Sequence, residues 1–488
     1  MRRSRSAAGG ATVWVGLAAL SVAGCHRSSG EGQASAPAEE AVADRAPDAE
    51  VALAPARCKR TDQAFVLASA DALDELELGD AVSYPGGIAV GLVHRTGAGR
   101  VGAVAMLARA PLKLTRIVDL GPTLGDAPPP RVGWRSPDLV AATYARQPTI
   151  KSGPAAGAAS APSGSTARSG MAGPGPAQGD DRDVALYAIT GDTGATLGAP
   201  RVVPQRRDDS LALDLAFSGP SGLLVWDEAT SAASGPRGVI KAAAFAKDHV
   251  AIAHDISPAE SDAELPRVAA AGPGFVVVWI ARLPEATVTD GSESEATGEA
   301  RAFGWLEMVS LDDRGIAIGA VRRLTHPGGH VSAFDLEARP AEPPAEEAEG
   351  AGTPTLLVVA RDDGEAVDGS GGTLLRVRVK GDTVEAPVAF ETDGLGRGAP
   401  SFVSDLAPTN GARTLALAWV GRDEDARFLP LDRAGSPTAP PSGEGALKDA
   451  RPLLFLDRLG GSPADGSSIL VASPSDSDAQ LRVFACAK

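Results

Sequence analysis

The nine residues Gly274–Arg282 (GFVVVWIAR) are the stretch of this 488-residue sequence that decides the fold. The run is apolar without interruption from Phe275 to Ala281. It is too short for a helix of this apolarity, and it lacks the alternation of a strand with one face in water. A continuous apolar run of this length is typical of a strand covered on both faces. The sequence therefore predicts a fully buried β-strand here.

Near-copies of this stretch recur along the chain. The sixth position is Trp in three copies, and the ninth is Arg in five. Successive sixth positions lie 51, 83, 53, 79, 61 and 53 residues apart, and the two long intervals contain low-complexity insertions. The underlying repeat is therefore about 50 residues long. The other copies are Gly87–Arg95, Asp138–Arg146, Ser221–Ala229, Thr353–Arg361 and Thr414–Arg422, with a degenerate seventh copy from Ser467.

Each repeat also carries the same flanking signals. A short segment opened by proline precedes the apolar strand, as at Pro130 and Pro400. A further strand follows it and ends in a turn rich in Asp and Gly, as at Ser310–Gly315. Four strands per repeat resemble a β-propeller blade. The resemblance implies an all-β fold, a seven-bladed β-propeller of four-stranded blades over residues 57–488. The alternative is a string of tandem β-sandwiches, which would need boundaries about every 100 residues.

The two ends of this body predict how the ring closes. The last repeat, from Arg451, has room for three strands before the chain ends, and the segment Cys58–Leu67 belongs to no repeat. We therefore expect closure by pairing of the N- and C-terminal strands. Cys58 and Cys486 lie in these two segments and are expected to form a disulfide in an oxidising compartment. The alternative is two free thiols.

The N-terminus carries the signals of a targeting segment. Arg2, Arg3 and Arg5 precede the apolar run Ala11–Val22, which is too short to span a bilayer. The run ends in Val22-Ala-Gly-Cys25, which resembles the lipobox of bacterial lipoproteins. That resemblance implies a signal peptide over 1–24, cleavage before Cys25 and acylation of its sulfur, including palmitate. The alternative is an ordinary secretory signal with a chance cysteine.

The lipobox resemblance also implies a location. The lipid bilayer would be a partner through the Cys25 acyl anchor, and the protein would lie in the cell envelope on the periplasmic or outer-surface side. His26 in place of an aspartate after the lipid cysteine favours the outer membrane. Residues 25–56, rich in Ala, Pro, Glu and Ser and without aromatic residues, are expected to form a disordered tether. Insertions are expected near 147–181, 283–300 and 340–352.

The charge balance excludes one class of partner. The net charge is −16 at pH 7, and it becomes −19 without residues 1–24, which contain three arginines and no acid. Such a balance argues against binding nucleic acid.

Four aspartates form a repeated pattern near the end of the first strand of a blade. In a propeller this strand lines the central channel, so their carboxylates could meet there and bind a cation or raise one another's pKa. The alternative, which we favour, is that each one caps a loop or bonds the backbone of a neighbouring blade. The four candidates are Asp214, Asp335, Asp405 and Asp457.

No motif of catalysis or of cofactor binding is found. The pair His326 and His330 is separated by Pro-Gly-Gly, which excludes the helix that would place both on one face, and Asp362–Gly369 lacks the spacing of an EF-hand loop. We therefore predict no metal, no cofactor and no catalytic residue.

Two hypotheses about function follow. The first is a non-catalytic binding or scaffold module with a protein or saccharide partner. The second is a propeller hydrolase or lyase acting on a saccharide or lactone at the channel mouth. Clustered Asp, Glu, His and Arg at the channel would favour the enzyme, and Ala, Ser and Val would favour the module.

Overall fold

The structure is a computed structural model, and it describes most of the repeat region. Of residues 57–66 and 442–487, where described, only the backbone path and pairing are given. The N-terminal signals, including Cys25, and most of the three insertions lie outside the described residues. The described ranges are 57–66, 77–97, 99–109, 112–123, 127–146, 182–204, 212–232, 235–283, 303–339, 354–364, 372–392, 394–396, 398–404, 415–422, 426–432, 434–438, 440–443, 451–456, 467–474 and 479–487.

Within these ranges every regular element is a β-strand. The described residues contain no helix long and apolar enough to cross a membrane. The strands form separate antiparallel sheets, mostly of four strands. The first three sheets from consecutive strands are β2–β5 (Glu77–Tyr84, Gly87–Thr96, Gly99–Arg109, Leu112–Pro122), β6–β9 (Arg131–Arg135, Asp138–Arg146, Arg182–Thr190, Arg201–Pro204) and β10–β13 (Leu213–Ser218, Ser221–Ala232, Gly235–Phe245, His254–Asp255).

The next three sheets follow the same plan. Sheet β18–β22 has a fifth short strand, because both β21 and β22 pair with β20. These sheets are β14–β17 (Asp262–Ala271, Gly274–Arg282, Trp305–Leu311, Arg322–Arg323), β18–β22 (Val331–Arg339, Thr355–Asp362, Thr373–Lys380, Thr383–Val384, Val388–Ala389) and β23–β26 (Ser401–Ser404, Leu415–Val420, Ala426–Leu431, Ser442–Gly443).

One further sheet is composite. Its order is β1-β29-β28-β27, with β27 at Arg451–Leu456, β28 at Ser467–Pro474, β29 at Ala479–Ala487 and β1 at Arg57–Val66. Six sheets are therefore built from consecutive strands, and the composite sheet combines both ends of the repeat region. No hydrogen-bonded ladder joins one described sheet to the next. The all-β propeller of four-stranded blades is confirmed, and the tandem-sandwich alternative is wrong.

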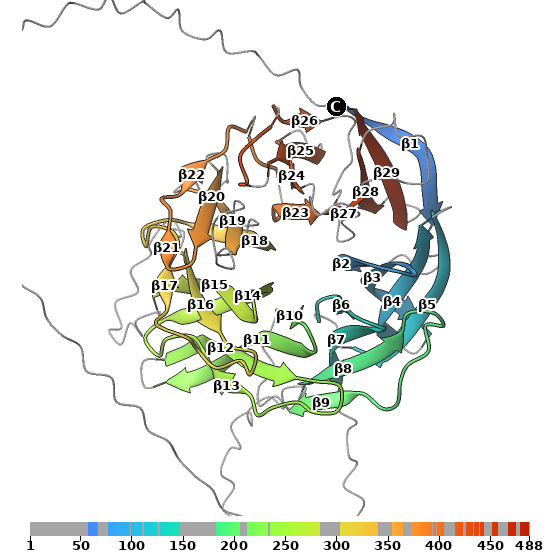
Figure 1. Cartoon of the computed structure of the whole chain (residues 1–488), viewed down its shortest axis with the longest axis horizontal. Helices are drawn as coiled ribbons and strands as arrows, with labels where there is room; N and C mark the ends of the chain where they lie inside the picture. The colour runs from blue at the N-terminus through green and yellow to red at the C-terminus, as the bar shows by residue number, and fades with distance from the viewer. Residues whose placement is uncertain are drawn as a thin grey trace, which may run out of the picture. The chain divides into compact units, whose positions relative to one another are not determined.

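The first strand of each sheet lies nearest the centre of the ring (Figure 1). These innermost strands are β2, β6, β10, β14, β18, β23 and β27, and each one contacts the first strand of the next sheet, with β27 contacting β2. Charged side chains on these strands can therefore reach a neighbouring sheet without leaving the centre.

The repeated nine-residue stretches are the second strands, as predicted. Alternate residues of one such strand belong to different hydrophobic clusters: Phe275, Val277 and Trp279 pack toward sheet β10–β13, whereas Val278 and Ile280 pack toward sheet β18–β22. Both faces of the strand are thus buried between neighbouring sheets, which is why the sequence shows no polar alternation. Trp226 and Trp279 are fully buried, and Trp419 is nearly so.

Candidate functional site

Five charged residues on consecutive first strands form what we call the axial network: Asp80, Arg131, Asp214, Arg267 and Asp335. Their signs alternate from sheet to sheet along β2, β6, β10, β14 and β18. Four of them face the fifth residue of the adjacent second strand: Arg131 pairs with Ala142, Asp214 with Val225, Arg267 with Val278 and Asp335 with Val359. The alternation therefore lies at nearly one height in the ring.

Direct contacts link the members of the axial network. Arg267 Nη1 donates to Asp80 Oδ2 over 3.0 Å, although the two residues are 187 positions apart in the sequence. Arg131 also forms an ion pair with Asp80, and its Nε donates to the Leu213 carbonyl at 3.1 Å. The Asp214 carboxylate lies 4.0 Å from Arg131 Nε. One carboxylate, that of Asp80, thus holds two guanidinium groups from different sheets.

Two of the predicted aspartates bond the backbone of the next sheet. Asp214 Oδ2 accepts from the Val268 amide at 2.9 Å, and Asp335 Oδ2 accepts from the Phe402 amide at 2.8 Å. The favoured alternative, a bond to a neighbouring blade's backbone, is therefore confirmed for these two. The prediction that they end their strands is wrong, because Asp214 is the second residue of β10 and Asp335 lies in the middle of β18. Asp405 and Asp457 lie outside the described residues.

Asp335 has a perturbed pKa. Burial raises the pKa of its carboxyl group above the ordinary aspartate value, and the nearby Asp214 charge acts in the same direction. Arg267 and the amides of Phe402 and Leu336 oppose this effect without cancelling it. A carboxyl group whose pKa is raised by burial, with charged neighbours around it, is a candidate for proton exchange.

A bulge in β14 adjoins the axial network. The register shifts between Glu264 and Arg267, and Leu265 adopts a φ of 54°, the left-handed region that disfavours a side chain. The Leu265 amide donates to Asp227 Oδ2 at 3.0 Å, and Asp227 Oδ1 accepts from the Ala212 amide at 3.1 Å. Burial raises the pKa of Glu264, although Arg282 opposes this, with its Nη1 2.5 Å from Glu264 Oε1. The bulge places Arg267 opposite Val278 and so directs it toward Asp80.

The remaining candidates are used locally. His326 Nδ1 accepts from the Gly328 amide at 3.0 Å, and the His330 ring stacks on Phe303 with centroids 5.1 Å apart. Asp362 Oδ1 accepts from the amides of His330 and Gly364. Among the described residues no three His, Cys, Asp or Glu side chains come together as metal ligands.

The two cysteines of the body are brought together. Cys58 on β1 is the register partner of Cys486 on β29. Facing residues of antiparallel strands have Cα atoms about 4.5–5.5 Å apart, which is within the reach of a disulfide. The backbone register agrees with the expected proximity, and the disulfide itself stays a prediction.

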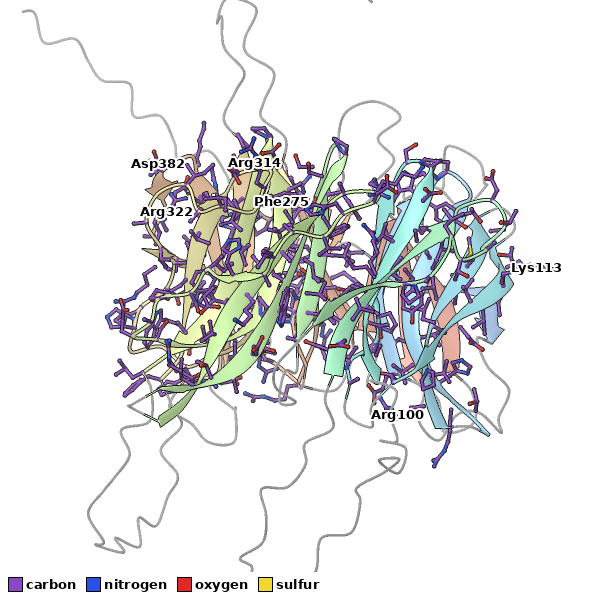
Figure 2. All side chains as sticks on the ribbon, turned by 90° about the horizontal axis from the view of Figure 1, so that it is seen from below. Arg100, Lys113, Phe275, Arg314, Arg322 and Asp382 are labelled. Atoms are coloured by element: carbon purple, nitrogen blue, oxygen red, sulfur yellow. The ribbon has the colours of Figure 1, made fainter. Side chains whose placement is uncertain are left out.

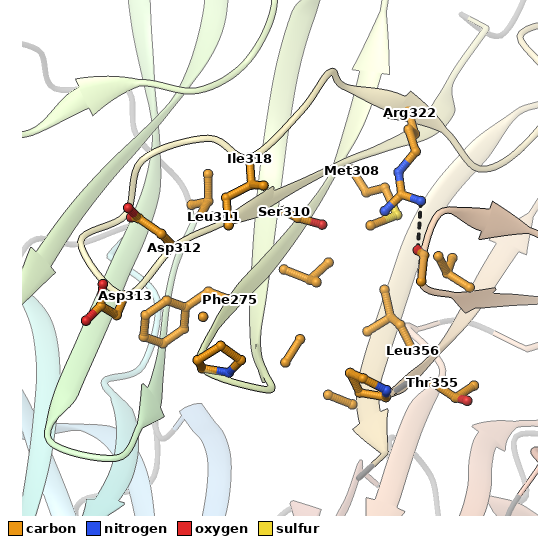
Figure 3. Close-up of a pocket in the computed structure, with 18 residues that line it drawn as sticks. Phe275, Met308, Ser310, Leu311, Asp312, Asp313, Ile318, Arg322, Thr355 and Leu356 are labelled. Atoms are coloured by element: carbon orange, nitrogen blue, oxygen red, sulfur yellow. Dashed lines mark hydrogen bonds between the residues drawn. The ribbon is translucent and has the colours of Figure 1, made fainter. Parts of the chain in front are cut away.

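A second feature is an apolar cleft of about 500 Å3 between sheets β14–β17 and β18–β22 (Figure 3). Phe275, Met308 and Leu356 form part of its wall. Asp312 and Asp313 lie at one end, and Arg322 lies at the other, where it donates to the Gly381 carbonyl at 2.9 Å. Volumes of about 300–1,000 Å3 are typical of ligand sites.

Sequence reasoning missed this cleft and three members of the axial network. Asp80, Arg131 and Arg267 are single charges with no spacing motif. One signal could have found Arg131 and Arg267, namely a charged residue within the proline-marked first strand. The cleft combines residues of two repeats, so no local pattern marks it.

No protein-family model matches the chain, and neither does any curated protein. Among solved structures, Trypanosoma rangeli sialidase in complex with sialic acid is similar at 10% identity with a TM-score of 0.39, over 89% of this chain and 59% of that one. A prolyl endopeptidase matches at 11% identity and a TM-score of 0.40, over 82% and 47%. A neuraminidase-like protein from A/bat/Guatemala/164/2009 matches at 8% identity with a TM-score of 0.36, over 74% of this chain and 87% of that one.

This chain thus spans less than two thirds of the length of the sialidase.

Proposed function

We propose that this protein is a lipid-anchored cell-envelope protein whose propeller is a non-catalytic binding or scaffold module. The observation that supports a non-catalytic module is that the charged groups of the axial network are paired with one another or with backbone amides. Asp214 and Asp335 accept hydrogen bonds from the backbone of the next sheet, and Asp80 is held by Arg131 and Arg267. Charges committed in this way hold the blades together. A catalytic centre needs such groups turned to a substrate.

The anchor rests on the lipobox resemblance at Val22–Cys25, and the bilayer is the partner that it supplies. An acylated Cys25 would hold the protein at the envelope, with the outer membrane favoured by His26. Two or more acyl chains give stable membrane binding where a single chain does not.

Replacing Cys25 tests the anchor. The variant Cys25→Ser lacks the sulfur that takes the lipid, so we expect the protein to move from the membrane fraction to the soluble fraction after a carbonate wash. Cys58→Ser is the matched control and should leave the protein with the membranes. Retention of the Cys25→Ser protein in the washed membranes would contradict the proposal.

We also infer that the composite sheet β1-β29-β28-β27 serves as the seventh blade and closes the ring. The pairing of β1 with β29 and the contact of β27 with β2 support this inference. A ring closed in this way offers its loops on two faces, where a partner can bind without any opening of the fold.

The alternative is a propeller hydrolase or lyase acting on a saccharide or lactone at the channel mouth. It is favoured by two specific observations: the centre of the ring carries Asp and Arg, and the pKa of Asp335 is raised. Assays of the full chain on glycoside and lactone substrates separate the two functions. Turnover that disappears in Asp335→Asn while the fold is retained would establish the enzyme and overturn the module.

A further inference from the structure

The apolar cleft between sheets β14–β17 and β18–β22 is bordered by an exposed loop of sheet β14–β17. The loop 312–319 forms one side of it and presents two exposed isoleucines, Ile316 at 54% and Ile318 at 61% exposure. The loop is well held, since Asp312 Oδ1 accepts from the amides of Arg314 and Ile316 at 2.9 and 2.8 Å. These hydrogen bonds hold the turn in a conformation that leaves both isoleucine side chains exposed to solvent.

The same turn occurs in sheet β23–β26 with polar residues in the corresponding places. There Asp432 Oδ1 accepts from the Ser436 amide at 2.7 Å, and the Thr438 amide donates to the Pro430 carbonyl at 3.0 Å. In the first turn the Ile318 amide donates to the Ser310 carbonyl in the same way, at 2.7 Å. Ser436 and Thr438 thus replace Ile316 and Ile318 without loss of the turn. Exposed apolar side chains beside an apolar cleft are typical of an interaction site, and the two isoleucines have this setting.

The cleft continues this apolar surface inward and carries charge at its ends. Phe275, Met308, Leu311 and Leu356 are almost fully buried and line it. The acidic end consists of Asp312 and the exposed Asp313 (Figure 3). Phe275, Arg314 and Arg322 lie on one face of the ring, and Arg100 lies toward the opposite face (Figure 2). Phe275 and Arg322 of the lining are thus reached from the same face of the ring.

We propose that this cleft binds a peptide segment of a partner protein that inserts an apolar side chain and places a lysine or arginine beside Asp312 and Asp313. The inference rests on the proposed binding-module function and names the partner's chemistry. A peptide is favoured over an enclosed small molecule because Ile316 and Ile318 extend the apolar surface outside the cleft, where only a larger partner would cover them. The hydroxyls of Ser310 and Thr355 and the Arg322 guanidinium lie in the lining and suit the polar backbone of such a segment.

The test uses the purified full chain and three fluorescein-labelled hexapeptides, measured by fluorescence anisotropy. One probe has two leucines flanked by lysines, the second has two leucines flanked by glutamates, and the third has two serines flanked by lysines. We expect saturable binding of the first probe only, and the binding should weaken as salt is raised.

Variants locate the binding. Ile316→Ser with Ile318→Thr installs the residues of the equivalent turn, and it should weaken the first probe by about tenfold or more. Asp313→Asn should weaken it several-fold and reduce its salt dependence. The matched control is Leu197→Thr, which alters the corresponding exposed position of the turn in sheet β6–β9 and should leave binding unchanged. Thermal unfolding verifies that all variants fold.

Three results would overturn the inference: no saturable binding, equal binding by wild type and the isoleucine double variant, or equal binding of the lysine- and glutamate-flanked probes. Capture of an uncharged alkyl alcohol with the same dependence on Ile318, in place of the peptide, would also overturn it in favour of a small-molecule site. Membrane fractionation of Cys25→Ser is independent of all these outcomes, so failure here is distinguishable from failure of the anchor.

Discussion

The side chains of the second strands explain how this sequence holds its sheets together. Trp226 packs between sheets β6–β9 and β10–β13, and its neighbour Val225 packs on the opposite side with Trp279. One strand therefore contributes to two interfaces at once. Truncating a ring in this position removes contacts that the rigid backbone on either side cannot replace.

We expect Trp279→Ala to lower the free energy of unfolding by about 3–5 kcal/mol, the usual cost of replacing a buried aromatic ring by alanine. Trp226→Ala should behave in the same way, because both rings are fully buried. Urea denaturation measures the difference. Ile252→Ala is the control, since Ile252 is 93% exposed and should change stability by less than about 0.5 kcal/mol. An unchanged midpoint for both tryptophan variants would show that these strands are not core.

Asp335 links stability to pH. Its folded-state pKa is raised by burial, so in the window from about pH 4 up to that raised value the folded protein binds more protons than the unfolded one. The contribution of Asp335 to the free energy of unfolding therefore falls as pH rises through this window. In Asp335→Asn this dependence is absent, so the variant should gain stability relative to wild type between pH 4 and pH 7. Parallel pH profiles of the two proteins, measured by urea denaturation, would contradict this prediction.

Which residues could be predicted depends on how local their signals are. Burial of Trp226, Trp279 and Trp419 was predictable, because a strand covered on both faces needs an unbroken apolar run. For Asp214 and Asp335 the sequence predicted a bond to the backbone of a neighbouring blade, but it did not predict which amide. The amide that each one accepts from is fixed by how adjacent sheets sit against each other, and no local sequence pattern records that arrangement.

At the scale of the element, the bulge in β14 is the most unusual feature. It interrupts the ladder between Glu264 and Arg267 and places Leu265 at a φ of 54°. An extra residue in one strand redirects the side chains that follow it. Here Arg267 is the side chain affected, and it reaches Asp80 on a sheet that is not adjacent to its own.

The strain at Leu265 predicts that glycine at this position gives a more stable protein than alanine, the reverse of the usual order in a strand. Left-handed backbone costs a residue with a side chain about 1–2 kcal/mol, whereas glycine adopts it freely. We expect Leu265→Gly to be more stable than Leu265→Ala by about 1 kcal/mol in urea denaturation. Ala269→Gly in the same strand is the control. Glycine should destabilise the fold there, because the backbone is ordinary β. Equal stability of Leu265→Gly and Leu265→Ala would contradict the strain.

The elements themselves differ in how far the sequence determines them. All seven apolar stretches coincide with second strands, and the Asp- and Gly-rich turns occur where they were expected. The fourth strands are harder to predict, because β13, β17 and β26 have only two residues each. A strand so short at the edge of a sheet carries no periodicity, and only its pairing with the third strand defines it.

At the scale of the whole molecule, the composite sheet predicts a covalent link. Cys58 and Cys486 face each other in register on β1 and β29. We expect a disulfide between them, and its reduction should lower the stability by about 2–5 kcal/mol, as for other native disulfides. The thermal midpoint with and without reductant measures the effect. Mass spectrometry of an unreduced digest should find the two peptides linked.

The double variant Cys58→Ser with Cys486→Ser is the control for this prediction. It should start from the lower midpoint and show no further response to reductant. If the wild-type midpoint were equally insensitive, the two cysteines would be free thiols in the folded protein.

The pairing of β1 with β29 has a consequence for the order in which the protein can form. Cys58 and Cys486 are 428 positions apart, so this ladder has the longest sequence separation of any in the described fold. Contacts between distant residues form late, because the entropy of closing the intervening chain must be lost first. During synthesis or export, β1 therefore waits as an unpaired edge until the last strand emerges. A chain halted before β29 would expose that edge to other chains, which makes premature termination an aggregation hazard.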